Sequence, residues 1–129
     1  MRAKRGVNQR GSVRLISGKW GGRVLSFPSI DGLRPTLGSQ RETLFNWLRP
    51  IIRNSRCLDL FAGSGALGFE AASGGANCVF LVEKSKKVYL SLLSNAELLN
   101  AENCRIFHTT AQSFLELYPE QFDIFFLDP

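Results

Sequence analysis

The sequence predicts an α/β protein with a doubly wound, mostly parallel sheet, preceded by an N-terminal β-hairpin and a helix. Three observations predict this class. Apolar runs of strand length alternate with stretches of helical period beyond residue 56, a glycine-rich turn follows the first run, and acids stand at the ends of three runs. Strands that are apolar throughout are buried on both faces, as in a parallel sheet covered by helices, and right-handed crossovers make such a sheet doubly wound.

The positive charge of the chain is concentrated near its start. Seven of the 16 Lys and Arg residues precede Asp31, the first of the 11 acids, so the rest of the chain has nine cations and a net charge of −2. Such a block predicts contacts with phosphate groups, and a solvated tail without a partner is the alternative. The candidate contacts are Arg2, Lys4, Arg5, Arg10, Arg14, Lys19 and Arg23, with Arg34 in the loop that follows.

We expect three segments. Residues 1–11 are polar and basic and are expected to form a disordered arm, residues 12–38 a hairpin and a loop, and residues 39–129 the α/β domain. In the hairpin, strands are expected at Val13–Ser17 and Arg23–Phe27. Trp20 lies in the turn between them, where it either stacks on a base or covers the body of the protein, and the sequence does not distinguish the two.

A helix is predicted from about Ser39. The residues Ser39 to Glu42 have the S-x-x-E form of a capping box, and Pro50 is expected to kink or end the helix. Its apolar stripe is expected to contain Leu44, Leu48, Ile51 and Ile52, flanked by Phe45 and Trp47.

Four strands and three helices are predicted beyond this helix. The strands are expected at Cys57–Phe61, Cys78–Val82, Arg105–His108 and Phe122–Leu127, and the helices at Ala66–Ser73, Ser85–Leu99 and Ala111–Leu117.

The glycine-rich turn lies in the segment LDLFAGSGALG, residues 58–68. Gly63, Gly65 and Gly68 have the spacing G-x-G-x-x-G between a predicted strand and a predicted helix. Glycine permits a positive φ and the close approach of a ligand, and the free N–H groups of a helix N-terminus favour an anionic group. This pattern predicts a ligand cradle, and a strand-to-helix turn without a ligand is the alternative.

Polar residues follow each predicted strand, at the edge of an open α/β sheet where ligands bind. Asp59 lies near the end of the first strand. Glu83 ends the second, 20 residues after Gly63, at a distance typical of a carboxylate that accepts ribose hydroxyls. Thr110-Ala111 follow the third strand and Asp128-Pro129 the fourth. The alternatives are a helix-capping role for Glu83 and a loop acid at Asp128, and the single histidine, His108, is given no role.

The composition gives little support to several other classes of protein. Cys57, Cys78 and Cys104 form no C-x-x-C pair, so we expect reduced core cysteines and no metal site. No apolar run has the length of a membrane span, and Met1 is followed by basic and polar residues without the apolar region of a signal peptide. We therefore expect a cytoplasmic protein without a membrane partner.

Separate motifs resemble those of one enzyme family. LDLFAGSGALG, Glu83 and FDIFFLDP resemble S-adenosylmethionine-dependent methyltransferases that modify exocyclic amino groups. GKWGGRVLSFP, GLRPT and RETLFNWL resemble the RsmD family, which methylates the guanine N2 amine of bacterial small-subunit ribosomal RNA. The similarity extends from about Val13 to Pro129. It implies a Rossmann-like class I methyltransferase sheet, and it makes residues 39–129 part of an S-adenosylmethionine-binding domain.

The resemblance also implies roles for individual residues. Asp128 and the Pro129 carbonyl would hold the target amine, and the partner would be ribosomal RNA or the small-subunit particle, bound by a monomer. The cofactor, converted to S-adenosylhomocysteine, would be bound by Asp59, Phe61, Gly63, Ser64, Gly65, Glu83, Thr110 and Ala111.

The family motif after the fourth strand reads Asp or Asn, Pro, Pro, aromatic, and this chain holds its first two residues. We therefore expect that the 129 residues are part of a longer protein with further strands. The alternative functions are methylation of another amine such as adenine N6, a nicotinamide-dependent oxidoreductase, and an RNA-binding fragment without catalysis.

Overall fold

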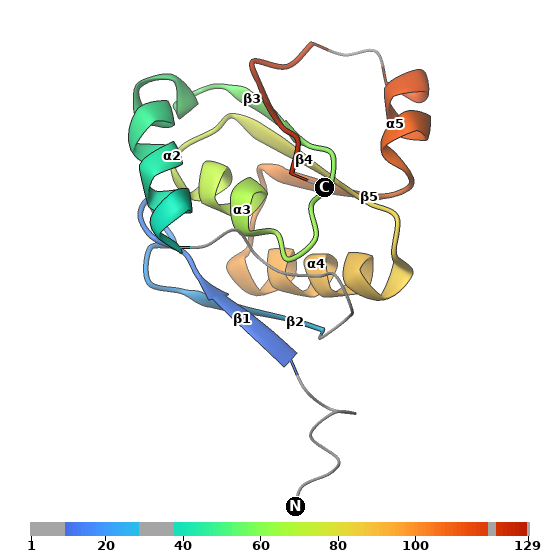
Figure 1. Ribbon diagram of the computed structural model, residues 1–129, viewed down its shortest axis with the longest axis horizontal. Helices are drawn as coiled ribbons and strands as arrows, with labels where there is room; N and C mark the ends of the chain where they lie inside the picture. Colours follow the sequence, from blue (N-terminus) through green and yellow to red (C-terminus); the bar gives the residue numbers. More distant parts are fainter. Residues whose placement is uncertain (1–9, 29–37, 119–120, 129) are drawn as a thin grey trace, which may run out of the picture.

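The computed structural model describes residues 10–28, 38–118 and 121–128, without the side chain of Arg10. Within these ranges, no helix is long and apolar enough to cross a lipid bilayer. Figure 1 shows the elements, which in chain order are β1 (Arg10–Arg14), β2 (Val24–Pro28), α2 (Gly38–Ile52), β3 (Arg56–Asp59), α3 (Ala66–Ser73), β4 (Cys78–Glu83), α4 (Lys86–Leu99), β5 (Cys104–His108), α5 (Ala111–Leu117) and β6 (Ile124–Phe126).

The central sheet is parallel, as the sequence predicts. Its order is β5-β4-β3-β6, and every neighbouring pair of strands is parallel. The last strand is shorter than the predicted Phe122–Leu127. It pairs with β3 alone, between Cys57↔Ile124 and Asp59↔Phe126, and β3 ends at Asp59, where the chain turns into the glycine loop. The length of β3 therefore limits the pairing of β6.

The two faces of the sheet carry separate groups of helices. Side chains of α2, α3 and α4 pack with Cys57, Leu81 and Phe126 on one face. Phe114 of α5 packs with Leu58 and Phe80 on the other face. Successive strand residues alternate between the faces, as the pleat of a strand requires. The described part of the sheet is therefore covered from both sides.

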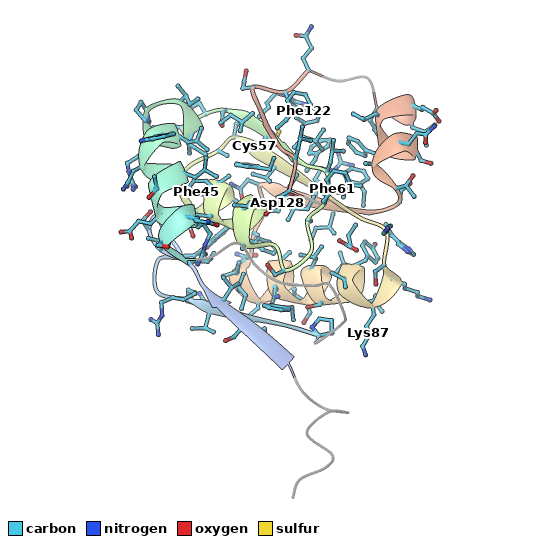
Figure 2. All side chains as sticks on the ribbon, in the orientation of Figure 1. Phe45, Cys57, Phe61, Lys87, Phe122 and Asp128 are labelled. Atoms are coloured by element: carbon cyan, nitrogen blue, oxygen red, sulfur yellow. The ribbon has the colours of Figure 1, made fainter. Side chains whose placement is uncertain are left out.

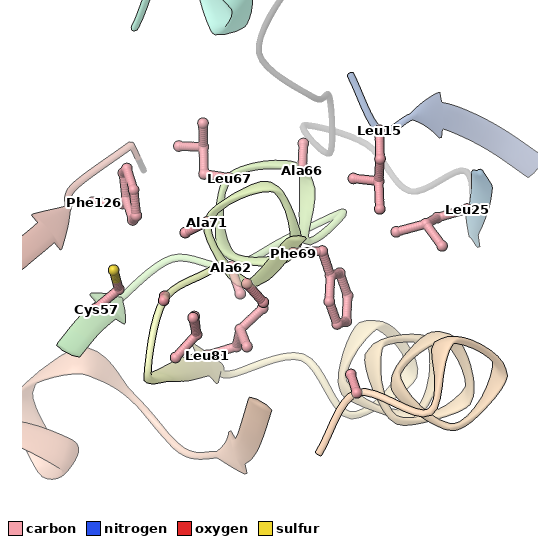
Figure 3. Packing of buried hydrophobic residues seen from close by; sticks show 14 of the residues in the cluster. Leu15, Leu25, Cys57, Ala62, Ala66, Leu67, Phe69, Ala71, Leu81 and Phe126 are labelled. Carbon is pink, nitrogen blue, oxygen red and sulfur yellow. The ribbon is translucent and has the colours of Figure 1, made fainter. Parts of the chain in front are cut away.

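The α3 helix lies at the centre of the larger core. All eight of its residues are buried. Figure 3 shows Phe69 of α3 facing Leu25 of the hairpin, whereas Leu67 lies toward Phe126 of β6. The helix therefore packs against the hairpin and the sheet at once.

The hairpin begins earlier than predicted. Arg10 and Gly11, which were expected in the arm, form the start of β1, and the strand ends at Arg14 instead of Ser17. The reason is that Ile16 and Ser17 donate their N–H groups to the Glu70 carboxylate, at 2.9 and 3.0 Å, instead of continuing the ladder. Residues 1–9 lie outside the described ranges, and so does most of the predicted loop.

Trp20 covers the body of the protein. Trp20 is 6% exposed and its side chain belongs to the larger core, and the Trp20 backbone N–H donates to Ser73 Oγ at 2.9 Å. Lys19 Nζ lies 4.8 Å from the centre of its ring on the outer side. Trp20 is therefore unavailable for stacking on a base.

A buried polar cluster joins the hairpin and α2 to α3. Besides Ile16 and Ser17, Glu70 binds Arg41 of α2 in an ion pair of 3.4 Å, and Arg41 also donates to the Arg14 carbonyl at 3.0 Å. One turn further along α3, the Ser73 hydroxyl donates to the Ser17 carbonyl at 2.7 Å. Buried charges are costly unless they are paired and hydrogen-bonded, and here Glu70 pairs with Arg41 and accepts two hairpin N–H groups. Arg41 Nε is the one buried nitrogen of the cluster without a hydrogen-bond partner among the described residues.

Glu70→Gln is expected to lower the free energy of unfolding by about 1.5–3 kcal/mol. The amide oxygen still accepts from the hairpin N–H groups, but Arg41 loses the charge that offsets its burial. Urea unfolding would measure the change. Glu42→Gln, on the exposed side of α2, is the control and should change stability by less than about 0.5 kcal/mol. Equal stability of both variants would contradict a stabilising role for the cluster.

The buried side of α2 differs from the predicted stripe. Phe45 and Ile52 are buried together with Arg41, whereas Ile51 is 58% exposed. Because Arg41 pairs with Glu70 of α3, the face of α2 that contains Arg41, Phe45 and Ile52 packs against the core. Pro50 lies in the last turn, and the helix continues to Ile52.

Candidate active site

The glycine loop connects β3 to α3 at the carboxyl edge of the sheet. Gly63 and Gly65 both have positive φ, 53° and 87°. A Cβ on Gly65 would lie 2.5 Å from the Phe69 ring and 2.9 Å from a Leu92 methyl group. The Ser64 hydroxyl, which is buried, accepts the Ala66 N–H at 3.2 Å. The backbone thus requires glycine at position 65, and the Ser64 side chain stabilises the loop itself.

Glu83 ends β4 and binds the loop directly. One carboxylate oxygen accepts the Gly63 N–H at 2.9 Å, and the other accepts the Ser85 N–H at 3.0 Å, where α4 begins. The predicted spacing of 20 residues therefore corresponds to a contact, and the helix-start role considered for Glu83 is also present. A carboxylate has about four acceptor positions, so Glu83 retains capacity for a ligand.

Asp59 is the last residue of β3 and is 1% exposed. Neither of its carboxylate oxygens has a hydrogen-bond partner of good geometry among the described residues. Burial raises the pKa of Asp59 to about 7, and the negative charges of Asp128 and Glu83 add to this effect. The nearby backbone N–H groups of Phe61 and Gly68 act in the opposite direction. A buried acceptor of this kind fits a ligand that brings a positive charge or a hydrogen-bond donor.

The remaining candidates lie at both ends of the same edge. Thr110 precedes α5, and its hydroxyl accepts the Ser113 N–H at 3.1 Å, so this side chain caps the helix that begins at Ala111. Asp128 is exposed and lies two residues beyond the end of β6. Figure 2 shows Asp128 near the centre of the view with Phe61, which is 42% exposed, to its right. Pro129 lies outside the described residues.

The strand order collects these residues along one edge. Thr110 follows β5, Glu83 ends β4, Asp59 and the glycine loop follow β3, and Asp128 follows β6. Strands are about 4.8 Å apart, so the edge from β5 to β6 spans roughly 14 Å. Three carboxylates on this edge disfavour a pyrophosphate group, and the Gly63 N–H is already bound to Glu83. The arrangement therefore suits an extended ligand with hydroxyl and cationic groups.

The candidate phosphate contacts do not form one group. Arg14, Lys19 and Arg23 are exposed on the hairpin. Lys19 donates its backbone N–H to Ser73, the last residue of α3, and the Arg23 guanidinium donates to the Leu98 carbonyl near the end of α4. Both helices end at the amino edge of the sheet, so these two cations lie far from Glu83 and Asp128. The remaining candidates lie outside the residues that the structure describes. They are Arg2, Lys4, Arg5, Arg34 and the side chain of Arg10.

Sequence reasoning assigned no role to Glu70 and Arg41, which set the position of the hairpin. A signal for Glu70 is present, because it is the one charged residue in the otherwise apolar or small helix Ala66–Ser73. Its partner lies 29 residues away in another element and cannot be identified from the pattern. His108, to which no role was given, stacks on Tyr89 with ring centres 5.1 Å apart.

Comparison with known proteins shows the family of this chain. Residues 13–129 match the family model described as Conserved hypothetical protein 95. Ribosomal RNA small subunit methyltransferase D of Escherichia coli K12 is 47% identical over 119 residues. The chain belongs to the RsmD family. A second RsmD relative, the enzyme of the same name from Haemophilus influenzae, is 45% identical over 126 residues.

The solved structure of yhhF from Escherichia coli superposes with a TM-score of 0.81 at 43% identity, and the match covers 92% of this chain and 64% of that one. The sheet is therefore the Rossmann-like sheet of class I methyltransferases. The matches cover 92% and 95% of this chain, but 60% of the RsmD relative from E. coli and 65% of the one from H. influenzae.

Proposed function

We propose that the protein transfers a methyl group from S-adenosylmethionine to the exocyclic N2 amine of a guanine in bacterial small-subunit ribosomal RNA. Membership of the RsmD family and the names of its relatives support methylation of ribosomal RNA. The observation that carries the proposal is the carboxyl edge of the sheet. There Glu83 of β4 binds the glycine loop that follows the buried Asp59 of β3, and the exposed Asp128 follows the next strand, β6. The guanine N2 atom is the finer part of the proposal and rests on the resemblance of GKWGGRVLSFP, GLRPT and RETLFNWL to the RsmD family, whereas FDIFFLDP supports an exocyclic amine as the target.

The described residues fit the cofactor. Gly63 and Gly65 leave the loop without side chains where a ligand would approach, and Glu83 has acceptor capacity for ribose hydroxyls. Asp59, whose carboxylate has no hydrogen-bond partner among the described residues, would accept from the methionine end. Phe61, Ser64, Thr110 and Ala111 would complete the cofactor site, the last two on the adenine side. When bound, S-adenosylmethionine supplies an electrophilic methyl group on a sulfonium.

Asp128 would prepare the nucleophile. The lone pair of a guanine N2 amine is delocalised into the ring, so this amine is a poor nucleophile. The Asp128 carboxylate would accept a hydrogen bond from one N–H group of the amine, and the Pro129 carbonyl would accept one from the other. These two hydrogen bonds would orient the lone pair and stabilise the positive charge that develops on nitrogen. Asp128 is exposed, so a base that has left its stack can reach it.

Glu83→Ala is expected to weaken S-adenosylmethionine binding by about 1.5–3 kcal/mol, the range for hydrogen bonds to a charged group. The contact with Gly63 is lost as well, so the loop also becomes less ordered. Calorimetry on the intact protein would measure the affinity. Glu116→Ala, on the exposed side of α5, is the control and should bind normally. Unchanged affinity in Glu83→Ala would remove this residue from the cofactor site.

The function itself is tested by methyl transfer. The intact protein is incubated with S-adenosylmethionine carrying a labelled methyl group and with unmodified small-subunit RNA or particles. Nuclease digestion and mass analysis then identify the labelled nucleoside. We expect N2-methylguanosine. Labelled N6-methyladenosine would move the target to adenine, and absence of label would overturn the proposed function.

A further inference from the structure

Four cations lie at the amino edge of the sheet, opposite the glycine loop. Lys19 and Arg23 lie there because their partners are at the ends of α3 and α4. Arg49 and Arg53, in and just after the last turn of α2, join them. The Arg49 guanidinium donates to the Ser17 hydroxyl at 3.3 Å, and the Arg53 stem lies beside Gly75, just after α3. We name these four residues the amino-edge cluster.

Among the residues that the structure describes, no carboxylate neutralises the charges of the cluster. The ion pair of Arg41 with Glu70 is the single salt bridge found in the described part of the chain, so no carboxylate of that part pairs with any of the four. Their contacts are with neutral groups: Ser17 and Asn46 for Arg49, the Leu98 carbonyl for Arg23, and the Trp20 ring for Lys19. All four side chains are exposed.

The backbone turn that carries Lys19 is held by the folded core. The buried Glu70 and Ser73 bind Ser17 through its N–H and its carbonyl, and Gly18 has a φ of 84° directly against the end of α3. A Cβ on Gly18 would lie 2.0 Å from the Ser73 carbonyl oxygen, so the turn that presents Lys19 is in close contact with α3. A charged surface that is fixed in advance binds without the cost of ordering a flexible arm.

We propose that the amino-edge cluster binds the phosphate backbone of the RNA substrate at a distance from the target base. This inference rests on the proposed function, which places the base at the opposite edge beside Asp128. Arginine is suited to phosphate because its planar guanidinium donates two parallel hydrogen bonds. The cluster adds Arg49 and Arg53 to the candidate phosphate contacts Lys19 and Arg23 of the hairpin.

The length of the strands determines how far the RNA must extend. The six residues of β4, at about 3.3 Å each, separate the two edges by roughly 20 Å. A strand of a DNA duplex places a phosphate about every 3.4 Å along the axis, and the A-form helix of RNA rises less per nucleotide, so roughly six or more nucleotides lie between the target and the cluster. A folded RNA or an assembled particle can contact both edges at once, whereas a short oligonucleotide at the target cannot.

A role confined to stability is the rival explanation. Cations near the ends of helices are stabilised by the partial negative charge of the last carbonyls, and Arg23 contacts such a carbonyl. This role predicts that removal of the cations lowers the free energy of unfolding and leaves the salt dependence of RNA binding unchanged. The two explanations therefore differ in a measurable quantity.

The test compares glutamine variants of the intact protein for binding to unmodified small-subunit RNA over a range of salt concentrations. Lys19, Arg49 and Arg53 are replaced together by glutamine. Arg105→Gln is the matched control, because Arg105 is an exposed cation on the other face of the sheet. Loss of three phosphate contacts should reduce the slope of log affinity against log salt by roughly 2–3, since each contributes about 0.7–0.9. Arg105→Gln should leave the slope unchanged.

Methyl transfer provides the second readout. The triple variant should raise KM for the long RNA at unchanged kcat and leave KM for a short oligonucleotide containing the target unchanged. A wild-type slope in the triple variant, or an equal loss in Arg105→Gln, would overturn the inference. Failure of the proposed function has a different outcome, because the wild-type protein would then transfer no methyl group while the salt slopes are still measured without cofactor.

Discussion

Replacement of Asp128 by alanine in the intact protein is expected to slow methyl transfer by roughly 10²–10³-fold and to leave S-adenosylmethionine affinity nearly unchanged. The magnitude follows from the loss of one preorganised polar partner of the reacting group. The separation of binding from chemistry follows from the strand order, because the proposed cofactor residues, Glu83 and the glycine loop, lie at the ends of β4 and β3, whereas Asp128 follows the edge strand β6. Single-turnover transfer of labelled methyl groups to unmodified small-subunit particles would measure the rate.

Two further variants make this result specific. Asp128→Asn should retain more activity than Asp128→Ala, because the amide oxygen can still accept one hydrogen bond. Asp123→Ala removes an acid from the opposite end of β6, where Asp123 accepts the Arg56 N–H at 2.8 Å, and should leave the rate of transfer unchanged. Full activity in Asp128→Ala would remove Asp128 from the chemistry, and with it most of the support for an amino-directed methyltransferase.

The elements of the sheet could be predicted because their patterns are local. The helices Ala66–Ser73 and Ala111–Leu117 have the predicted bounds, and Glu83 ends its strand as expected. A buried parallel strand shows its apolar run directly in the sequence, and the glycine turn has its own signature. The sequence predicts a ligand-binding or helix-capping role for Glu83, and the structure adds its contact with Gly63, which forms because the carboxyl ends of neighbouring parallel strands meet at one edge.

Features that depend on contacts between distant elements could not be predicted. The buried side of α2 is set by Arg41, whose partner Glu70 belongs to α3, and the hydrophobic pattern alone favoured Ile51 over Phe45. The early end of β1 has the same cause. Trp20 could equally have faced solvent, because nothing in its turn reveals that the turn packs against α3. The sequence shows the hairpin cations as part of one basic block with the cations of residues 1–11, and only the topology shows that Lys19 and Arg23 lie at the amino edge of the sheet.

The stability of the protein is expected to depend on pH through Asp59. Burial raises the pKa of this carboxyl from 3.8 to about 7 in the folded state. Between these values the folded protein binds more protons than the unfolded chain, so the free energy of unfolding falls as pH rises through this interval. One proton corresponds to about 1.4 kcal/mol per pH unit, so ionisation of Asp59 costs the fold on the order of 4 kcal/mol by about pH 7.

Asp59→Asn isolates this contribution because asparagine has nearly the same shape and does not ionise. The buried amide of the variant lowers stability by a constant amount of about 1–3 kcal/mol if it finds no hydrogen-bond partner. The informative quantity is therefore the slope of the free energy of unfolding against pH, and not the absolute stability. Urea unfolding of both proteins from about pH 4 to about pH 8 should show the wild type losing stability relative to the variant up to about pH 7 and a constant difference above it. Parallel curves would mean that Asp59 ionises in the fold as readily as in the unfolded chain. A loss of wild-type stability toward low pH that is absent in the variant would mean that groups around Asp59 already stabilise its negative charge. Asp59 would then not require a positively charged ligand to compensate its burial.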